Sequence, residues 1–259
     1  MLLTIDIGNT NMEFGVYEND VLSVNFRLVT KQDITSDEIG LMASQFFAIH
    51  GIEPSTFEDV VITSVVPQVM HSVNNAIRKY IGREPLTVGE NLLIDIQNKY
   101  DNPKEVGADR LVNAYAGFRK YGGPLIVVDF GTATTFDVIS DEGAYLGGVI
   151  YPGIRISMDA LFQHAAKLPR VEIARPKHAI GRNTVDSMQA GAIYGYVGAV
   201  QNIVSAIERE LGQKTRVIAT GGLARLIGKQ ADLFEAIDRS LTLDGLTMIY
   251  RDYRNRLSD

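Results

Sequence analysis

The chain has 259 residues, of which 46% are hydrophobic, and its formal net charge is −6. Its lysines and arginines are scattered, so the composition argues against nucleic acid or an anionic membrane as the main partner. It has no cysteine, which excludes disulfides, thiolate catalysis and zinc-thiolate sites, and its four histidines show no metal-ligand spacing.

Residues 1–28 contain three short β-rich runs separated by turns, which predicts a meander. Because Asp6 interrupts the first apolar run, we expect no signal peptide and a cytoplasmic location. Thr35 and Glu38 have the spacing of a capping box and predict a helix that Gly51 ends. A buried strand is expected at 60–66, a helix from Pro67 to about residue 81, and a short strand at 86–88.

A further helix is expected from Ala108 to the glycines at 122–123. A second meander follows from residue 125, then helices and a strand at 215–219, a short strand near Leu241 and a C-terminal helix. Residues 187–207 carry no charge, but glycines and amides dilute their hydrophobicity, so they predict a buried helix rather than a membrane span. Its glycines would let another backbone approach, at an interdomain seam or a subunit interface.

The start of the chain is repeated at its midpoint. In both copies an apolar strand ends in Asp-x-Gly, at Asp6 to Gly8 and at Asp129 to Gly131, and short polar residues lead into a second strand. The repeat predicts an α/β fold of two subdomains, residues 1–120 and 121–259, each with a mixed sheet in the order β-β-β-α-β-α-β. A ligand is expected in the interdomain cleft, where the two acidic turns suit a nucleoside triphosphate.

Neither a Walker sequence nor a G-x-G-x-x-G after a strand occurs, so phosphates would be held differently. Glycine turns expose backbone N–H groups, and the asparagines and threonines beside them add side-chain donors. Asp6 and Asp129, at the strand ends, could hold Mg²⁺, directly or through water, or a monovalent cation. A single Asp-x-Gly is more often only a turn, but two copies in matching contexts favour a site.

Gly107 to Arg110 opens a predicted helix, whose exposed N–H groups favour anions. Asp109 is then either an ordinary N-terminal helix residue or a base that accepts a proton from a hydroxyl during phosphoryl transfer. Arg110 could bind a substrate carboxylate. Gly221 and Gly222 follow a strand and could let a flat base lie against the backbone, although a turn alone would also explain them.

Four motifs in this order resemble those of the type III pantothenate kinase family, in the actin, Hsp70 and sugar-kinase superfamily with ribonuclease H-like, actin-like subdomains. They are D-I-G-N-T-N at 6–11, G-A-D-R at 107–110, D-F-G-T-A-T-T-F-D at 129–137 and T-G-G-L-A at 220–224. The resemblance covers nearly the whole chain. It implies ATP-dependent phosphorylation of pantothenate to 4'-phosphopantothenate, the first step of coenzyme A biosynthesis.

The resemblance also implies site residues and partners. Asp109 would be the general base, Asp129 would bind K⁺ or NH₄⁺, and Asp6 would bind the Mg²⁺ of ATP. ATP and its phosphates would be bound by Asp6, Ile7, Gly8, Asn9, Thr10, Asn11, Met12, Glu13, Gly131, Thr132, Thr134, Gly221 and Gly222. Pantothenate would be bound by Tyr100, Gly107, Ala108, Asp109, Arg110 and Thr184, in a pocket completed across the interface of a homodimer.

Two alternatives remain at this point. One is a regulatory protein on the same scaffold, like the Bvg accessory factor that the family also resembles, and the other is a sugar or acetate kinase. The presence of Asp6, Asp109 and Asp129 favours an enzyme, and the Gly107–Arg110 motif together with Asn183-Thr184 favours pantothenate. Met12 and Glu13 occupy positions at which members of the family vary, and whether the charge of Glu13 faces the triphosphate is left open.

Overall fold

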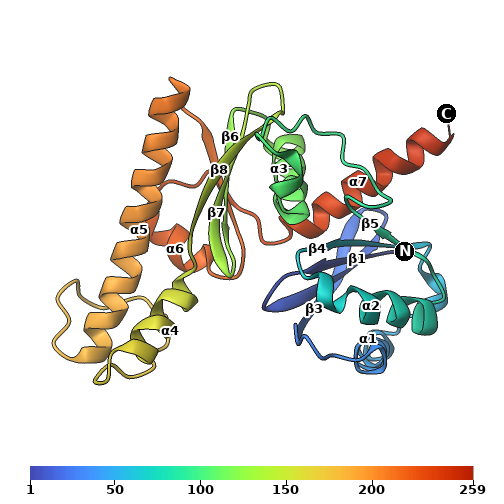
Figure 1. Cartoon of the computed structure of the whole chain (residues 1–259), viewed down its shortest axis with the longest axis horizontal. Helices are drawn as coiled ribbons and strands as arrows, with labels where there is room; N and C mark the ends of the chain where they lie inside the picture. Colours follow the sequence, from blue (N-terminus) through green and yellow to red (C-terminus); the bar gives the residue numbers. More distant parts are fainter. Residues whose placement is uncertain (259) are drawn as a thin grey trace. The chain divides into compact units, whose positions relative to one another are not determined.

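The computed structural model describes residues 1–258 and divides into two compact units (Figure 1). Among the described residues, unit 1 comprises 1–96, 101–116 and 240–258, and unit 2 comprises 97–100 and 117–239. The expected boundary near residue 120 lies close to the passage from Ala116 to Gly117. The segment from Ser240 onward, expected in the second half, groups instead with unit 1.

Unit 1 is built on a five-stranded mixed sheet. Its strands are β1 (Leu2–Ile7), β2 (Asn11–Glu18), β3 (Val21–Val29), β4 (Asp59–Ser64) and β5 (Pro85–Thr87). Their order is β3-β2-β1-β4-β5, where β1 is antiparallel to β2 and parallel to β4. The expected meander and the two later strands are therefore present, and the carboxyl ends of β1 and β4 lie at the same edge.

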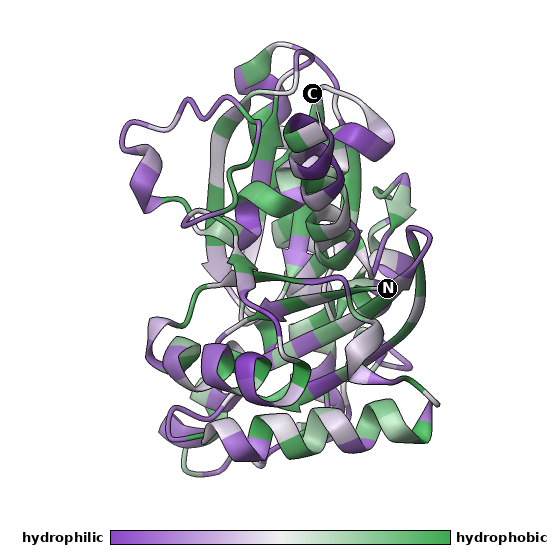
Figure 2. Ribbon diagram, turned by 90° about the vertical axis from the view of Figure 1, so that its right-hand side faces the viewer, coloured by the Kyte–Doolittle hydropathy of each residue, from purple (hydrophilic) through white to green (hydrophobic). Residues whose placement is uncertain are grey.

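Helices cover both faces of this sheet. They are α1 (Ser36–Ile49), α2 (Pro67–Ala76, extended by a π turn over Ile77–Ile81), the first part of α3 (Ala108–Tyr121) and α7 (Leu241–Ser258), with short 3₁₀ turns at Pro54–Thr56 and Pro103–Glu105. Thr35 and Glu38 form the predicted capping box. On one face, Phe14 of β2 packs with Phe47 of α1 and Val73 of α2, and the alternating hydrophilic and hydrophobic residues of these two helices are visible in Figure 2.

The other face explains why α7 belongs to unit 1. Leu243, Leu246 and Ile249 repeat at helical spacing and are buried with Val61 of β4 and Val112 of α3. The expectation of a strand near Leu241 is wrong, because Leu241 is the first residue of this helix. The last strand of unit 2 lies earlier in the chain.

Unit 2 repeats the arrangement of unit 1. Its strands are β6 (Leu125–Phe130), β7 (Ala133–Ile139), β8 (Tyr145–Pro152), β9 (Arg216–Thr220) and β10 (Ala236–Ile237), and its helices are α4 (Ile154–His164), α5 (Thr184–Leu211) and α6 (Ala224–Ala231). The strand order β10-β9-β6-β7-β8 corresponds strand for strand to that of unit 1. The predicted fold of two related mixed-sheet subdomains is thus confirmed.

The uncharged segment 187–207 lies within helix α5, and one face of this helix is buried in the core of unit 2, as expected. In α5, Ile193, Tyr196 and Val200 pack with α4, α6 and the sheet of unit 2. This helix is also long and apolar enough to cross a membrane by length and composition, a test that core helices pass as well. On its outer face, apart from the neighbouring residues and backbone of the helix itself, no described atom lies within 4 Å of a β-carbon built at Gly191, Gly195 or Gly198.

Candidate active site

The first Asp-x-Gly turn lies at the carboxyl edge of the unit 1 sheet, between β1 and β2. Gly8 N–H donates to Asn11 O at 3.0 Å, which closes the turn and leaves Asn9, Thr10 and Asn11 exposed. Thr30, just after β3, secures the turn twice: its Oγ1 donates to Gly8 O at 2.7 Å and its N–H to Thr10 O at 3.0 Å. The turn is therefore fixed while its polar side chains remain accessible.

The residues predicted around this turn differ in what they can offer a ligand. Ile7 and Met12 are completely buried in the unit 1 core, so only their backbone groups are available. Glu13 stands directly opposite Asp6 in the β1–β2 ladder. Its carboxylate accepts hydrogen bonds from Asn25 Nδ2 at 2.9 Å and Arg27 Nη2 at 2.6 Å. Glu13 is therefore an ion-paired carboxylate.

The Gly107–Arg110 segment begins α3, also in unit 1. A β-carbon at Gly107 would lie 2.6 Å from Asp109 Oδ1 and 3.4 Å from Val65 Cγ1, and Val65 N–H donates to Ile7 O. The segment is thereby packed beside the strand end that carries the first turn. Only glycine leaves the Asp109 carboxylate room in this position.

Asp109 has the electrostatics expected of a proton acceptor. Burial raises the pKa of its carboxyl group, while the hydrogen bond from Arg110 N–H at 2.8 Å and the charge of Arg110 oppose this shift. A carboxylate that is poorly solvated binds a proton more readily than an exposed one. Because a general base works best with a pKa nearer the operating pH, the environment suits Asp109 to that role.

The second Asp-x-Gly turn lies at the carboxyl edge of the unit 2 sheet. A β-carbon at Gly221 would lie 2.3 Å from Asp129 Oδ1, and one at Gly131 would lie 3.7 Å from the same atom. Gly153, before α4, supports the turn: its β-carbon position is only 1.9 Å from Thr132 O. Three glycines thus bring backbone against the Asp129 carboxylate and the turn that follows it.

The threonines of this turn point to opposite faces of β7. Thr135 lies opposite Asp129 in the ladder and shares its face. Thr132 is exposed at the turn, whereas Thr134 is 1% exposed and its hydroxyl has no hydrogen-bond partner among the described residues. Of the two threonines predicted to contact ATP, Thr132 presents its side chain to solvent and Thr134 does not.

Tyr100 belongs to unit 2, although it precedes the segment 101–116. Residues 97–99 form a bridge to β8 in which Tyr145 N–H donates to Gln97 O and Lys99 N–H to Tyr145 O. The ring of Tyr100 lies 3.7 Å from the β-carbon position of Gly147 and 6.4 Å, centroid to centroid, from Tyr145. The ring of Tyr100 is therefore half-buried, and the backbone before it is held by hydrogen bonds to β8.

The remaining predicted residues sit on well-defined backbone. Thr184 is the first residue of α5 and is exposed, and Asn183 caps that helix by accepting from Asp186 N–H at 2.9 Å. Gly221 has a φ of +90°, in the range that glycine tolerates best. Gly221 therefore serves both the turn after β9 and the close approach to Asp129.

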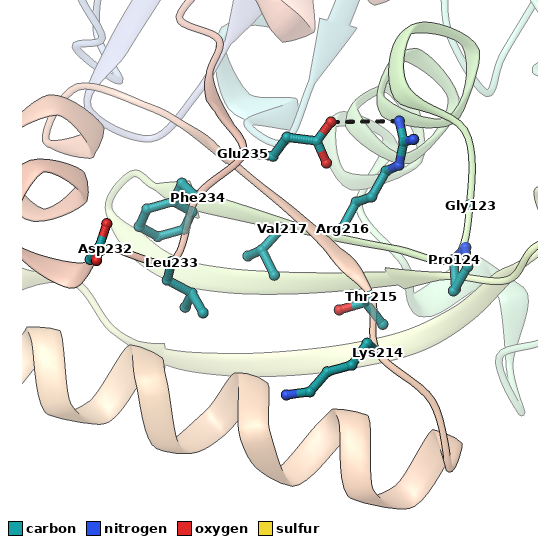
Figure 3. A pocket seen from close by; sticks show the side chains of 10 residues that line it. All are labelled: Gly123, Pro124, Lys214, Thr215, Arg216, Val217, Asp232, Leu233, Phe234 and Glu235. Atoms are coloured by element: carbon teal, nitrogen blue, oxygen red, sulfur yellow. Dashed lines mark ion pairs between the residues drawn. The ribbon is translucent and has the colours of Figure 1, made fainter.

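An open cavity of 490 Å³ lies in unit 2 but away from these turns (Figure 3). Its lining includes Pro124, Lys214 and an ion pair of Arg216 with Glu235 at 3.6 Å. Leu125 pairs with Arg216 at the amino ends of β6 and β9, whereas Asp129 pairs with Thr220 at the carboxyl ends. Since ligands of such sheets bind at the carboxyl ends, the cavity is separate from the candidate site.

The turns offer oxygen donors suited to hard cations. In the described residues no group of three or more acidic or histidine side chains could hold a metal by itself. A single carboxylate that shares a cation with phosphate oxygens is the usual arrangement for Mg²⁺ bound with a nucleotide. Asp6 and Asp129, each at a strand end beside a glycine turn, fit this arrangement.

Two supporting residues were missed from the sequence. Thr30 and Gly153 hold the first and second turns, but each contacts its turn from about 20 residues away in the chain. Thr30 follows a strand and Gly153 precedes a helix, which are ordinary positions for these residue types. No local signal distinguished them.

Solved structures resemble the whole chain. A Baf family transcriptional activator from Campylobacter jejuni aligns over 98% of this chain and 99% of its own at 21% identity, with a TM-score of 0.61. A 2-dehydro-3-deoxygalactonokinase from Sinorhizobium meliloti aligns over 97% and 96% at 12% identity, also with a TM-score of 0.61. At these identities the likeness shows the two-lobed fold of sugar-kinase-like proteins.

A sequence family gives a sharper assignment. The model of the family described as type III pantothenate kinase matches residues 2–206, which include both Asp-x-Gly turns, Gly107–Arg110 and Thr184. This family consists of phosphotransferases of coenzyme A biosynthesis that use ATP. The chain therefore belongs to the type III pantothenate kinase family.

Proposed function

We propose that this protein transfers the γ-phosphoryl group of ATP to the primary hydroxyl of pantothenate, with Asp109 as general base. The observation that carries the proposal is the environment of Asp109: a partly buried carboxylate with a raised pKa at the start of α3, in the Gly107–Arg110 motif that resembles the family's substrate segment. An ordinary helix N-terminal aspartate would be solvated and would have no such shift.

In the proposed reaction, the pantothenate hydroxyl oxygen forms a bond to the γ-phosphorus while the bond to the bridging oxygen of ADP breaks. The hydroxyl proton passes to the Asp109 carboxylate. The turn N–H groups and the side chains of Asn9, Thr10 and Thr132 donate hydrogen bonds to phosphate oxygens. Mg²⁺, bound with ATP near Asp6, would supply charge neutralisation on the phosphates.

The proposed substrate contacts come from groups of different chemistry. The Arg110 guanidinium would pair with the pantothenate carboxylate, and Tyr100 would offer a ring face and a hydroxyl. Thr184 would add a hydroxyl at the amino end of α5, and Asp129 would bind K⁺ or NH₄⁺. The four residues lie within the range that the family model matches, and their positions in the motifs that resemble the family support these assignments.

The decisive test is a coupled ADP-release assay with pantothenate, a panel of sugars and acetate as acceptors, each with and without K⁺. We expect turnover with pantothenate alone, stimulated by K⁺. Turnover with a sugar or acetate would replace the proposal with a kinase of another specificity. Nucleotide binding without turnover of any acceptor would favour a regulatory protein.

We also propose that the protein is a homodimer, as the family resemblance implies, and that the outer face of α5 lies at the interface. On that face Tyr194 is 48% exposed beside the open positions of Gly191, Gly195 and Gly198. Gly195→Trp should raise the dissociation constant of the dimer in sedimentation equilibrium, while Glu210→Trp, nearer the end of the helix, should not. A wild-type monomer at micromolar concentration would contradict the proposal.

A further inference from the structure

Four side chains form a row across the unit 1 sheet at the level of the first turn. The ladder pairs Arg27 of β3 with Glu13 of β2, Glu13 with Asp6 of β1, and Asp6 with Thr63 of β4. Directly paired residues project to the same face of a sheet with β-carbons about 5 Å apart. The row therefore reads cation, anion, anion, hydroxyl, and its two carboxylates are neighbours.

Such a row poses an electrostatic problem for a phosphate site. Like charges directly opposite one another destabilise a sheet, and a second carboxylate would also repel a polyphosphate bound at the first turn. The side chain of Glu13 is only 16% exposed, so solvent screens its charge incompletely. On the other side of Asp6, the Thr63 hydroxyl is buried without a partner among the described residues and carries no charge.

The structure shows how the second carboxylate is held. Arg27 Nη2 lies 2.6 Å from Glu13 Oε2, and Asn25 Nδ2 lies 2.9 Å from Glu13 Oε1. Both carboxylate oxygens thus accept from β3, on the side away from Asp6. The pair directs the negative charge of Glu13 toward Arg27 and fixes the rotamer of Glu13.

We propose that Arg27 is a positioning residue for nucleotide binding: it neutralises and restrains Glu13, and thereby keeps the edge beside Asp6 favourable for the phosphates of Mg·ATP. Arg27 acts through Glu13 and does not itself contact the nucleotide. The inference rests on the proposed role of the first turn in ATP binding. It does not depend on the identity of the phosphoryl acceptor.

The test is a double-mutant cycle read by calorimetric binding of Mg·AMPPNP, a non-hydrolysable ATP analogue, in the absence of pantothenate. Arg27→Met should weaken binding about tenfold, the effect of one uncompensated, partly screened charge. In the double variant Glu13→Gln/Arg27→Met, affinity should return to within about twofold of wild type. With ATP and pantothenate, Arg27→Met should raise the KM for ATP far more than it lowers kcat.

A matched control is available in the same unit. Arg251 Nε pairs with Asp20 Oδ1 at 2.6 Å, the same distance as the Arg27–Glu13 pair, at the β2–β3 turn far along the hairpin from Asp6. Arg251→Met should leave AMPPNP affinity within about twofold of wild type. An equal loss in this variant would mean that Arg27→Met acts through general destabilisation, which overturns the proposal.

The cycle separates the possible failures. If the double variant binds as weakly as Arg27→Met, Arg27 contacts the nucleotide directly and the proposal is wrong. If Arg27→Met does not fold, the single variant Glu13→Gln decides. In that variant the positive charge of Arg27 is no longer neutralised by Glu13, so AMPPNP should bind about threefold more tightly. Unchanged or weaker binding would refute the inference. If the AMPPNP affinities of the variants are as expected but the protein does not turn over pantothenate, only the proposed substrate is refuted.

Discussion

The two units contain the same scaffold with different residues beside its shared aspartate. In unit 1, Asp6 lies between Glu13 and Thr63, and in unit 2, Asp129 lies at the equivalent position between Thr135 and Thr220. The aspartate and the threonine of the parallel neighbour are common to both units. The antiparallel neighbour is a carboxylate in unit 1 and a hydroxyl in unit 2, so the two turns present different charges to a ligand.

The units also support their turns by different means. In unit 1 the hydroxyl and N–H of Thr30 hold the backbone of Gly8 and Thr10. In unit 2 the backbone of Gly153 packs directly against Thr132. A side-chain hydrogen bond can be removed or retained by choosing the substituted residue. A close backbone contact, by contrast, leaves no room for even one added atom. The duplication therefore preserved the turn itself but not its supports.

The largest expected effect comes from Asp109, for which unit 2 has no counterpart in the matched motifs. Asp109→Asn keeps the shape of the side chain and its hydrogen bond from Arg110 N–H but removes the proton acceptor. We expect kcat to fall about 10²- to 10⁴-fold, the usual range for a general base. The measurement is steady-state ADP release with pantothenate, with Asp33→Asn, an exposed aspartate of unit 1, as control. Undiminished turnover would assign the base elsewhere.

The same variant has a pH signature. Because burial raises the pKa of Asp109, the acid limb of kcat/KM should lie above the ordinary carboxyl value of 3.8 and should disappear in Asp109→Asn. A raised pKa in the folded state means that the folded protein retains this proton more tightly than the unfolded chain. Ionisation of Asp109 therefore lowers stability as pH rises, so Asp109→Asn should be at least as stable as wild type at pH 7. A lower melting temperature would contradict this account.

Local signals predicted the fold well. The repeated Asp-x-Gly turns, the Thr35–Glu38 capping box and the amphipathic spacings each depend on residues close in sequence, and the structure confirms them. The grouping of the C-terminal helix was missed because its partners, Val61 and Val112, are far away in the chain. The apolar residues Leu243, Leu246 and Ile249 repeat at helical spacing, which favours a helix over a strand at this point of the chain.

The site was predicted less completely, for a similar reason. Motifs mark the residues that are proposed to contact the substrates or the cation directly, such as Asp109 and Asp129. Residues that act through another group carry no local pattern. Arg27 meets Glu13 only through the register of a hairpin, and that register depends on the packing of the whole sheet.

A second prediction separates the two aspartates by function. Asp129→Ala should abolish stimulation by K⁺, because its carboxylate is the proposed ligand of that cation. Asp6→Asn should instead weaken binding of Mg·AMPPNP while leaving stimulation by K⁺ in the residual activity. The measurement is ADP release over a K⁺ titration at saturating pantothenate. A parental K⁺ response in Asp129→Ala would place the cation site elsewhere.

A third prediction compares the backbone of the two turns. Gly153→Ala would place a β-carbon 1.9 Å from Thr132 O, so the second turn must move, and we expect about a tenfold rise in the KM for ATP. Gly8→Ala is the counterpart in unit 1, where the added atom would lie 3.4 Å from Asn11 O and fits with a slight adjustment. Steady-state kinetics of both variants should therefore show the larger defect in unit 2. Equal defects would mean that both turns tolerate substitution alike.

The smallest effect is expected at Thr30. Thr30→Val removes the hydroxyl that donates to Gly8 O at 2.7 Å but keeps the size of the side chain and the N–H bond to Thr10 O. Loss of one partly buried hydrogen bond costs about 1 kcal/mol, so the KM for ATP should rise about fivefold. Thr30→Ser retains the hydroxyl and should stay near wild type in the same assay. If Ser and Val variants lose affinity equally, the β-branched side chain rather than the hydrogen bond holds the first turn, and the units support their turns more similarly than the contacts indicate.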